Sequence, residues 1–342
     1  MQNFWDKLPK PFFVLAPMAD VTDCVYRRVI AERGKPDVFF TEFTSADGLA
    51  HERGREKLLV NLKYSELERP IVAQIFGSRP ENIKKSATLC RELGFDGIDI
   101  NMGCPDRAVE KQGAGAAMIK TPRLAREVID AAREGSGGLP VSVKTRLGYN
   151  EVDWDWLKML ANSGIAALTV HLRTRKEMSK VGAHWELASK LQELSLSAQG
   201  AKLIANGDVE DMSDAREKAE KYDPDGVMLG RAIFGNPWLF ANLASSRSSQ
   251  IEHPAEALAK GGRPAWSTIF STIIYHSKLF EKEFPPRSLP AQAGLGGVGK
   301  SFAVMRKFFG AYVKGHPQAS DLREQLMKCE NSNEVESVLK RF

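Results

Sequence analysis

The residues best suited to chemistry are Asn101 and Cys104, which lie in the segment Asn101–Pro105. This segment follows the apolar run Gly97–Ile100, which is typical of a short buried strand. Functional side chains concentrate where such strands end, because a rigid scaffold there supports an exposed chain. Cys104 is therefore a candidate for thiol chemistry, although a single cysteine is more often a small buried hydrophobe.

Two neighbouring features favour a functional role for this cysteine. Pro105 restricts the backbone directly after the thiol. The segment Gln112–Met118 carries two glycines, and glycines allow a loop to approach a ligand closely before the next helix.

The elements that must position these residues form a repeating pattern. Eight short apolar runs recur, and nearly every one ends in polar residues, glycine or proline: Phe12–Ala16, Val38–Glu42, Ile71–Ile75, Gly97–Ile100, Val141–Lys144, Ala167–His171, Lys202–Ala205 and Gly226–Leu229. Helical spacing fills several intervals, at Pro80–Leu93, Arg123–Glu134, Val152–Ser163 and Met212–Lys221. Eight strand–helix repeats predict an α/β fold, a (β/α)8 TIM barrel. An open doubly wound sheet has the same periodicity, but no G-x-G-x-x-G follows the first run.

In a barrel the carboxyl ends of all eight strands meet on one face, where active sites lie. The runs would bring there Pro17, Met18, Ala19, Glu42, Gln74, Asn101, Cys104, Lys144, Arg146, His171, Arg173, Arg175, Asn206, Gly207, Asp208, Gly230 and Arg231. Taken singly, Gln74 and Asn206 could cap the barrel, Lys144 could form a salt bridge, and His171 could be a core histidine. Together, a thiol, a lysine, amides and small residues after the last two strands indicate a cofactor with a polar ring and a phosphate tail.

The length and the charge distribution indicate a second module. The chain has 342 residues, whereas a barrel takes about 250. From Ser245 onward there are 14 Lys and Arg against 9 Asp and Glu, and the rest of the chain has 34 of each. This bias suits a C-terminal module that faces a polyanion, although it could also be a solvated surface.

We therefore expect a barrel domain over 1–243, a linker over 244–264 and a helical domain over 265–342. The linker is rich in Ser, Ala, Gly and Pro. The helical domain has helical spacing over Trp266–Glu283, Lys300–Lys314 and Ala319–Arg341. Bases and aromatics interleave around Met305–Phe309, but an ordinary amphipathic helix would explain much of that pattern.

The segment Gly294–Ser301 matches the P-loop pattern G-x-x-x-x-G-K-[ST]. A P-loop leaves the end of a buried strand, and the preceding segment Phe284–Ala293 contains three prolines and no strand pattern. We interpret Gly294–Gly299 as a glycine-rich connection rather than a nucleotide site.

Other classes of protein are disfavoured by composition. The four cysteines include no C-x-x-C pair, which argues against a disulfide framework and against a metal site. No apolar run reaches the roughly 18 residues of a membrane span. We expect a cytoplasmic monomer with no membrane partner.

The ordered motifs of the chain resemble those of the flavin-dependent tRNA-dihydrouridine synthases. The matching segments cover the whole barrel and continue into the helical region: Leu15–Asp23, Gln74–Gly77, Asp99–Pro105, Val143–Gly148, His171–Arg175, Asn206–Asp208, Gly226–Trp238 and Val304–Gly315. Any one of these motifs is weak, but the first seven in register make the match specific.

The resemblance implies reduction of uridines in tRNA to 5,6-dihydrouridine, with NADPH reducing a bound FMN. Hydride would reach carbon 6 of the uracil, and Cys104 would protonate carbon 5 as a general acid. FMN would be held by Pro17, Met18, Ala19, Gln74, Lys144, His171, Asn206, Gly207, Asp208, Gly230 and Arg231. Asn101 and Arg173 would hold the uracil, and the basic helical domain would bind the tRNA.

Two other functions remain open from the residues alone. A flavin barrel oxidoreductase acting on a small enone or a free pyrimidine would share the cofactor site but would not need residues 265–342. A catalytically silent RNA-binding protein would bind no flavin. Leu172 and Asp20 stand where family members commonly carry glycine, and these departures concern the identity of the substrate rather than the flavin chemistry.

Overall fold

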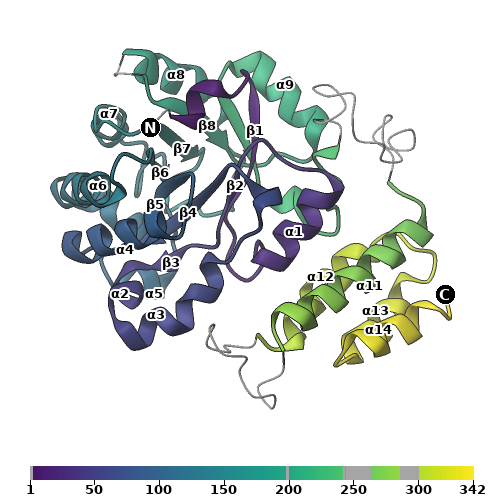
Figure 1. Cartoon of the computed structure of the whole chain (residues 1–342). Coiled ribbons are helices and arrows are strands. Elements are labelled where there is room, and N and C mark those ends of the chain that lie inside the picture. The colour runs from purple at the N-terminus through teal and green to yellow at the C-terminus, as the bar shows by residue number, and fades with distance from the viewer. Residues whose placement is uncertain (1–2, 198–199, 242, 244–262, 286–299) are drawn as a thin grey trace. The chain divides into compact units, whose positions relative to one another are not determined.

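The computed structural model describes residues 3–197, 200–241, 243, 263–285 and 300–342. It contains the expected (β/α)8 barrel (Figure 1). The strands are β1 (Phe12–Leu15), β2 (Phe39–Phe40), β3 (Thr44–Ser45), β4 (Ile71–Phe76), β5 (Gly97–Met102), β6 (Val141–Arg146), β7 (Ala167–His171), β8 (Lys202–Asn206) and β9 (Gly226–Leu229). All eight predicted runs correspond to barrel strands, and β3 is a short extra strand beside β4.

All the strand pairs are parallel, in the order β1-β9-β8-β7-β6-β5-β4-β2. The ring is completed between β1 and β2 by a single bridge between Val14 and Val38, where Leu15 N donates to Val38 O over 3.3 Å. One buried cluster gathers alternate residues of these strands, among them Phe12, Val14 and Phe40, around Trp5 of the short helix η1 (Phe4–Lys7). Because all the strands run in the same direction, their carboxyl ends meet on one face.

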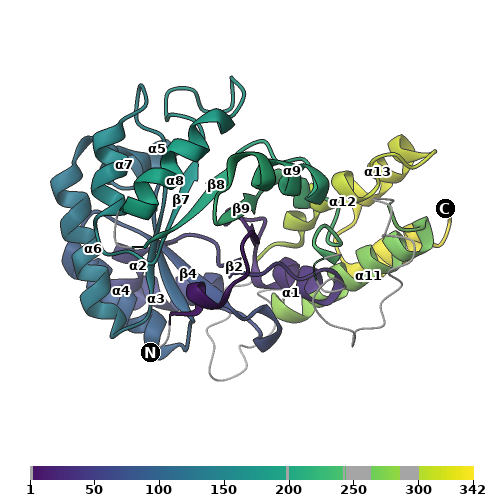
Figure 2. The ribbon, with the colours of Figure 1, turned by 90° about the horizontal axis from the view of Figure 1, so that it is seen from above.

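Helices lie outside the strands, and α4, α6 and α7 follow one another along one side (Figures 1 and 2). Proline at the first position starts both α4 and α6, where its missing N–H costs no hydrogen bond. Asp153 and Asp211 cap α7 and α9 through their carboxylates. The barrel helices are α2 (Ala46–Ala50), α3 (Glu52–Leu58), α4 (Pro80–Glu92), α5 (Arg107–Glu110), α6 (Pro122–Ser136), α7 (Trp154–Ala161), α8 (Ala188–Ser197) and α9 (Met212–Tyr222), with 3-10 turns η2 (Leu59–Leu62), η3 (Glu66–Glu68), η4 (Gly115–Lys120) and η5 (Trp185–Leu187).

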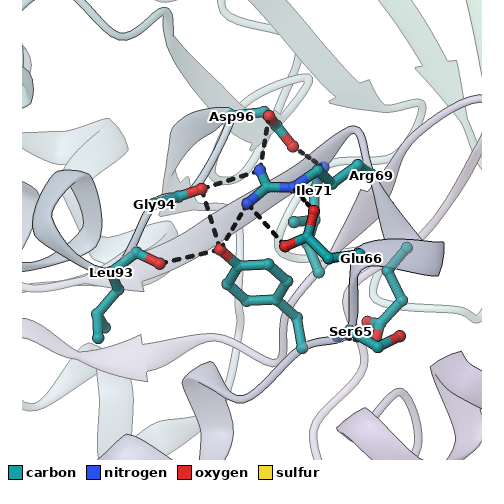
Figure 3. Close-up of polar contacts among 9 residues, drawn as sticks. Ser65, Glu66, Arg69, Ile71, Leu93, Gly94 and Asp96 are labelled. Carbon is teal, nitrogen blue, oxygen red and sulfur yellow. Dashed lines mark hydrogen bonds and ion pairs between the residues drawn. The ribbon is translucent and has the colours of Figure 1, made fainter.

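A cluster around Arg69 joins the amino ends of β4 and β5, away from the strand ends that carry the candidate site (Figure 3). The guanidinium forms ion pairs with Glu66 and Asp96 and donates to the Tyr64 hydroxyl and, over 2.9 Å, to Gly94 O. The Asp96 carboxylate also accepts from the backbone N–H of Ile71. Several hydrogen bonds and ion pairs therefore depend on the Arg69 guanidinium. They lie at the amino-terminal face of the barrel, where residues serve stability rather than catalysis.

By internal contacts the chain divides into two compact units. The first contains residues 1–22 and 36–230, and the second contains 23–35 and 231–342. Helix α1 (Cys24–Arg33) follows the first barrel strand in sequence, yet it belongs to the second unit, where it contacts α11 (Trp266–Glu283) (Figure 2). The boundary expected at residue 243 stays a prediction, because the linker over 244–264 falls almost wholly outside the described residues.

The second unit is helical, as expected. Its remaining elements are η6 (Arg231–Ile233), η7 (Phe302–Met305), α12 (Arg306–Tyr312), α13 (Ala319–Lys328) and α14 (Ser332–Leu339). The helix expected over Ala319–Arg341 is in fact two helices, because the Asn331 side chain caps a new helix by accepting from Glu334 N. Phe308, Phe309 and Tyr312 are buried, so the aromatics near Met305 form core contacts.

The remaining features concern the glycine-rich segment, helices that could span a membrane, and metal sites. The segment Gly294–Gly299 lies outside the described residues, whereas Ser301 is described and caps η7. Within the described part of the chain, no helix combines the length and the apolar character needed to cross a bilayer. The same residues contain no group of His, Cys, Asp and Glu side chains arranged to hold a metal ion.

Candidate active site

The Cys104 thiol lies two residues beyond the carboxyl end of β5. The strand runs to Met102 and so includes Asn101, which the sequence predicted just after it. Cys104 is half-buried beside Phe43, Phe76, Val109 and Ala114. Burial raises the pKa of its thiol, so this group stays protonated at neutral pH and can donate a proton.

The backbone around the thiol is held on both sides. Asn101 Oδ1 accepts from the N–H groups of Gly103 and Cys104, over 3.1 and 2.9 Å. Cys104 O in turn accepts from Ala116 N over 2.9 Å. Gly115 has φ +61°, and a Cβ at this position would lie 2.6 Å from Cys104 O. Gly115 thus allows close approach to the loop Gly103–Pro105, called the thiol loop below, whereas the predicted approach of this segment to a ligand stays a prediction.

Two cations extend from β6 toward the same face. Lys144 Nζ donates to Asn206 Oδ1 over 3.2 Å, and burial together with nearby Arg146 lowers the lysine pKa to about 8. Arg146 ends the strand, and burial lowers its pKa to about 10. Its guanidinium donates to Gly103 O over 2.8 Å and to Thr174 O over 3.1 Å. Lys144 therefore links β6 to the end of β8, while Arg146 joins two loops.

The side chains of Gln74, Asn101 and Asp99 form a chain of hydrogen bonds between β4 and β5. Asn101 Nδ2 donates to Gln74 Oε1 over 3.1 Å, and Gln74 Nε2 donates to Asp99 Oδ2 over 2.7 Å. Burial raises the pKa of Asp99 to about 6, although Ser142 and Gln74 both donate to its carboxylate. Neither Asp99 nor Ser142 is among the site residues predicted from the sequence. The available signal was a carboxylate within an apolar strand, which cannot be buried without partners.

The loops after β7 and β8 are tied together by an arginine and an aspartate. Arg173 is buried, forms an ion pair with Asp208, and donates from Nε to Val181 O over 2.7 Å. The same Asp208 oxygen accepts from Ala183 N. His171 ends β7, in register with Asn206 on β8. Arg173, predicted to bind the substrate, and Asp208, predicted to bind the cofactor, thus also hold these two loops together.

The last two strand ends present small residues. Gly207 has φ +133°, and a Cβ there would lie 2.9 Å from the Ala183 Cβ, so only glycine suits this position. At Gly230 a Cβ would meet nothing closer than Ala16 at 3.7 Å and Met18 at 3.9 Å. The absence of that Cβ leaves room beside the Pro17–Ala19 loop.

Arg231 directly follows Gly230 and opens η6, the first element after the barrel strands that is assigned to the second unit, and its role stays a prediction. The other predicted residues all belong to the first unit, on the strands or in the loops directly after them. Arg175 and Glu110 form a bidentate ion pair between the β7 and β5 loops, which accounts for the Arg175 charge.

Comparison with known proteins identifies the family. A family model described as dihydrouridine synthase (Dus) matches residues 14–342. A probable tRNA-dihydrouridine synthase of Staphylococcus aureus (strain COL) is 43% identical over 344 aligned positions, covering 100% of this chain and 96% of the relative. Probable tRNA-dihydrouridine synthase 2 of Bacillus subtilis (strain 168) is 42% identical and covers 100% and 97%.

Among solved structures, histamine dehydrogenase from Rhizobium sp. 4-9 has a TM-score of 0.52 over 97% of this chain and 62% of its own, at 13% identity. A likeness at that identity concerns the fold alone. The family model and the full-length relatives agree with the resemblance of the sequence motifs, and the chain belongs to the dihydrouridine synthase family.

Proposed function

We propose that this enzyme reduces specific uridines in tRNA to 5,6-dihydrouridine, with FMN as cofactor, NADPH as electron donor and Cys104 as general acid. The observation that carries the proposal is the position of the Cys104 thiol, which lies directly after β5 on a backbone held by Asn101, and burial raises the pKa of this thiol. Membership of the dihydrouridine synthase family supports the same reaction.

The chemistry of the donors fits a flavin with a phosphate tail. Lys144 and the Gln74 amide are hydrogen-bond donors suited to the carbonyl and nitrogen edge of an isoalloxazine ring. Gly207 and the open position at Gly230 suit a phosphate, since small residues let backbone N–H groups approach it. When bound, FMN would supply a hydride received from NADPH.

Within this proposal the roles of the chain's own groups differ. Lys144 places positive charge beside the ring. Because its pKa is about 8, most of the lysine is still charged at neutral pH. Cys104 donates its proton to the uracil carbon 5, and Asn101 offers the substrate its second Nδ2 hydrogen. Pro17, Met18, Ala19, His171, Asn206, Asp208, Arg231 and Arg173 keep the cofactor and substrate roles predicted from the resemblance.

The tRNA partner is supported by the excess of basic residues after Ser245. A uridine within folded RNA must be unstacked before it can enter a barrel, which costs a few kcal/mol. Contacts between exposed lysines, such as Lys307 and Lys314 of the helical unit, and RNA phosphates would offset that cost.

Nucleoside mass spectrometry of tRNA from cells with and without this gene tests the function. We expect dihydrouridine to disappear at defined positions in the deletion strain and to return with the wild-type gene but not with Cys104→Ala. Unchanged dihydrouridine, with flavin still bound to the purified protein, would instead indicate a reductase of small enones or free pyrimidines.

Reversing two charges on the helical unit distinguishes the reduction of tRNA from the reduction of small enones or free pyrimidines in vitro. Lys307→Glu with Lys314→Glu should slow tRNA reduction while FMN content and NADPH oxidation by free acceptors stay at the wild-type level. Equal turnover of tRNA by the variant would contradict the proposed RNA surface.

A further inference from the structure

The Asp99 carboxyl group is fully buried in the middle of β5, and its pKa of about 6 leaves it mostly ionised at neutral pH. Ser142 Oγ donates to its Oδ1 over 2.6 Å, and Gln74 Nε2 donates to its Oδ2 over 2.7 Å. Neither of these hydrogen bonds reaches the thiol loop, so the influence of Asp99 on Cys104 passes through other side chains.

An ionised carboxylate only accepts hydrogen bonds. The Gln74 amide therefore has one allowed orientation, with Nε2 toward Asp99 and Oε1 toward Asn101. A flipped Gln74 would place its oxygen against the carboxylate, where two acceptors would face each other in a buried position. Asp99 thus fixes which end of Gln74 meets Asn101.

The same argument fixes Asn101. Gln74 Oε1 accepts from Asn101 Nδ2, which leaves Asn101 Oδ1 to accept from Gly103 N and Cys104 N. A flipped Asn101 would aim its NH₂ group at two backbone N–H groups and lose both bonds. The orientation of Asn101 is therefore fixed from both sides, by the Gln74 acceptor and by the two backbone donors, and Asp99 fixes the Gln74 end of this chain of bonds.

We infer that Asp99 is the positioning residue for Cys104: through Gln74 and Asn101 it sets the direction of the hydrogen bonds that hold the thiol loop. This inference rests on the proposed role of Cys104 as general acid, and it adds a residue that does not touch the reacting atoms. Ser142 supports the carboxylate but does not determine the direction.

The fixed direction also constrains the substrate. Both lone pairs of Asn101 Oδ1 are used by backbone N–H groups, so this side chain can only donate to a ligand, through its second Nδ2 hydrogen. In the proposed reaction Asn101 thus meets a uracil carbonyl oxygen and not the N3–H group.

Three variants separate the effect of the hydrogen-bond direction from the effect of the Asp99 charge. Asp99→Leu removes the acceptor for Gln74. In Asp99→Asn the new amide can accept from Gln74 while donating to Ser142, whose hydroxyl also lies 3.4 Å from Ile98 O, so the direction survives. Ser142→Ala leaves the carboxylate and the direction intact and serves as the matched control.

The first readout is alkylation of each cysteine by iodoacetamide, measured by peptide mass spectrometry on the full-length protein as purified. Cys24, Cys90 and Cys329 are buried and report general unfolding. We expect Asp99→Leu to change the alkylation rate of Cys104 alone, making it about tenfold faster, with Asp99→Asn and Ser142→Ala within about threefold of wild type.

The second readout is uridine reduction at equal flavin content, which should fall about tenfold in Asp99→Leu and recover in Asp99→Asn. If Asp99→Leu exposes all four cysteines, Gln74→Met tests the same connection one residue later and should release Cys104 alone. Wild-type alkylation of Cys104 in a folded Asp99→Leu or Gln74→Met protein would overturn the inference. The alkylation result needs no RNA, so it is independent of the proposed function.

Discussion

Arg146 Nε donates a 2.8 Å hydrogen bond to the carbonyl oxygen of Gly103, so the last residue of β6 holds the backbone directly before the thiol. The same guanidinium donates to Thr174 O and Met178 O in the β7 loop. Arg146→Met leaves these carbonyls without their donor, and we expect the free energy of unfolding to fall by about 2 kcal/mol. Urea denaturation measures this change. Arg146→Lys keeps the charge without the planar fork, so a wild-type stability for that variant would show that charge alone suffices.

Cys104→Ala should retain FMN and the oxidation of NADPH by the flavin while uridine reduction falls by about 10²-fold or more. The reason is that the thiol supplies a proton only to the substrate. Stopped-flow measurement of the two half-reactions separates these steps. Cys329→Ala is a control at a buried cysteine of the second unit, and uridine reduction by Cys104→Ala at the wild-type rate would exclude the thiol as the acid.

Lys144→Met should lower the two-electron midpoint potential of the bound flavin by about 20–60 mV, because a charge-assisted contact is worth about 1–3 kcal/mol and about 30 mV corresponds to 1.4 kcal/mol. The lysine pKa of about 8 predicts that the difference from wild type is largest below pH 8 and shrinks above it. Spectroelectrochemistry at pH 7 and pH 9 measures this dependence. A difference that grows with pH would contradict the assignment of Lys144 to the ring.

Arg69→Met should destabilise the barrel without affecting the bound flavin. The arginine holds Glu66, Asp96 and the Gly94 carbonyl together at the amino ends of β4 and β5 (Figure 3). Removing it takes one donor each from Asp96, Gly94 O and the Tyr64 hydroxyl, at a cost of about 1–3 kcal/mol. Thermal unfolding with flavin spectra recorded in parallel measures both effects. Arg123→Met, at an exposed pair with Glu127, is the control and should change the unfolding free energy by less than about 0.5 kcal/mol.

His184 should make stability depend on pH. Hydrogen bonding to Glu177 raises the pKa of this histidine above its ordinary value of 6.5, with a second contribution from Glu186. A raised pKa in the folded state stabilises the fold fully below pH 6.5, and this contribution is lost as the pH rises through the raised value. The difference in Tm between wild type and His184→Gln should therefore be larger at pH 6 than at pH 9. Glu177→Gln should make the stability depend less on pH. A Tm difference between wild type and His184→Gln that increases toward pH 9 would contradict the assigned role of His184.

The parts of the structure that the sequence predicted are those set by local patterns. The runs Ala167–His171 and Gly226–Leu229 are strands over their whole predicted length, because short apolar runs and the turn residues that bound them are local signals. The break in the last helix depended on one cap at Asn331, which periodicity does not reveal. Placing the strand ends together followed from the barrel topology alone.

The connections within the site were harder to predict, because they depend on pairs distant in sequence. Asp99 and Ser142 come from neighbouring strands, and their contact follows from the register between β5 and β6. The ion pair between Asp208 and Arg173 likewise joins residues distant in sequence, so it could be recognised only from their positions in the structure. Residue type and spacing indicate which groups reach a strand end but not which partner each one takes.

The membership of α1 in the second unit has a consequence for the order in which the protein can be completed. Tyr26 of α1 is fully buried, stacks on His276 and packs against Phe308, both of which are synthesised more than two hundred residues later. At about 5–20 residues per second, a ribosome takes roughly 10–50 s to reach these partners. During that interval an early helix has an uncovered apolar face, so the emerging chain presents a surface that a chaperone can recognise until its C-terminal helices arrive.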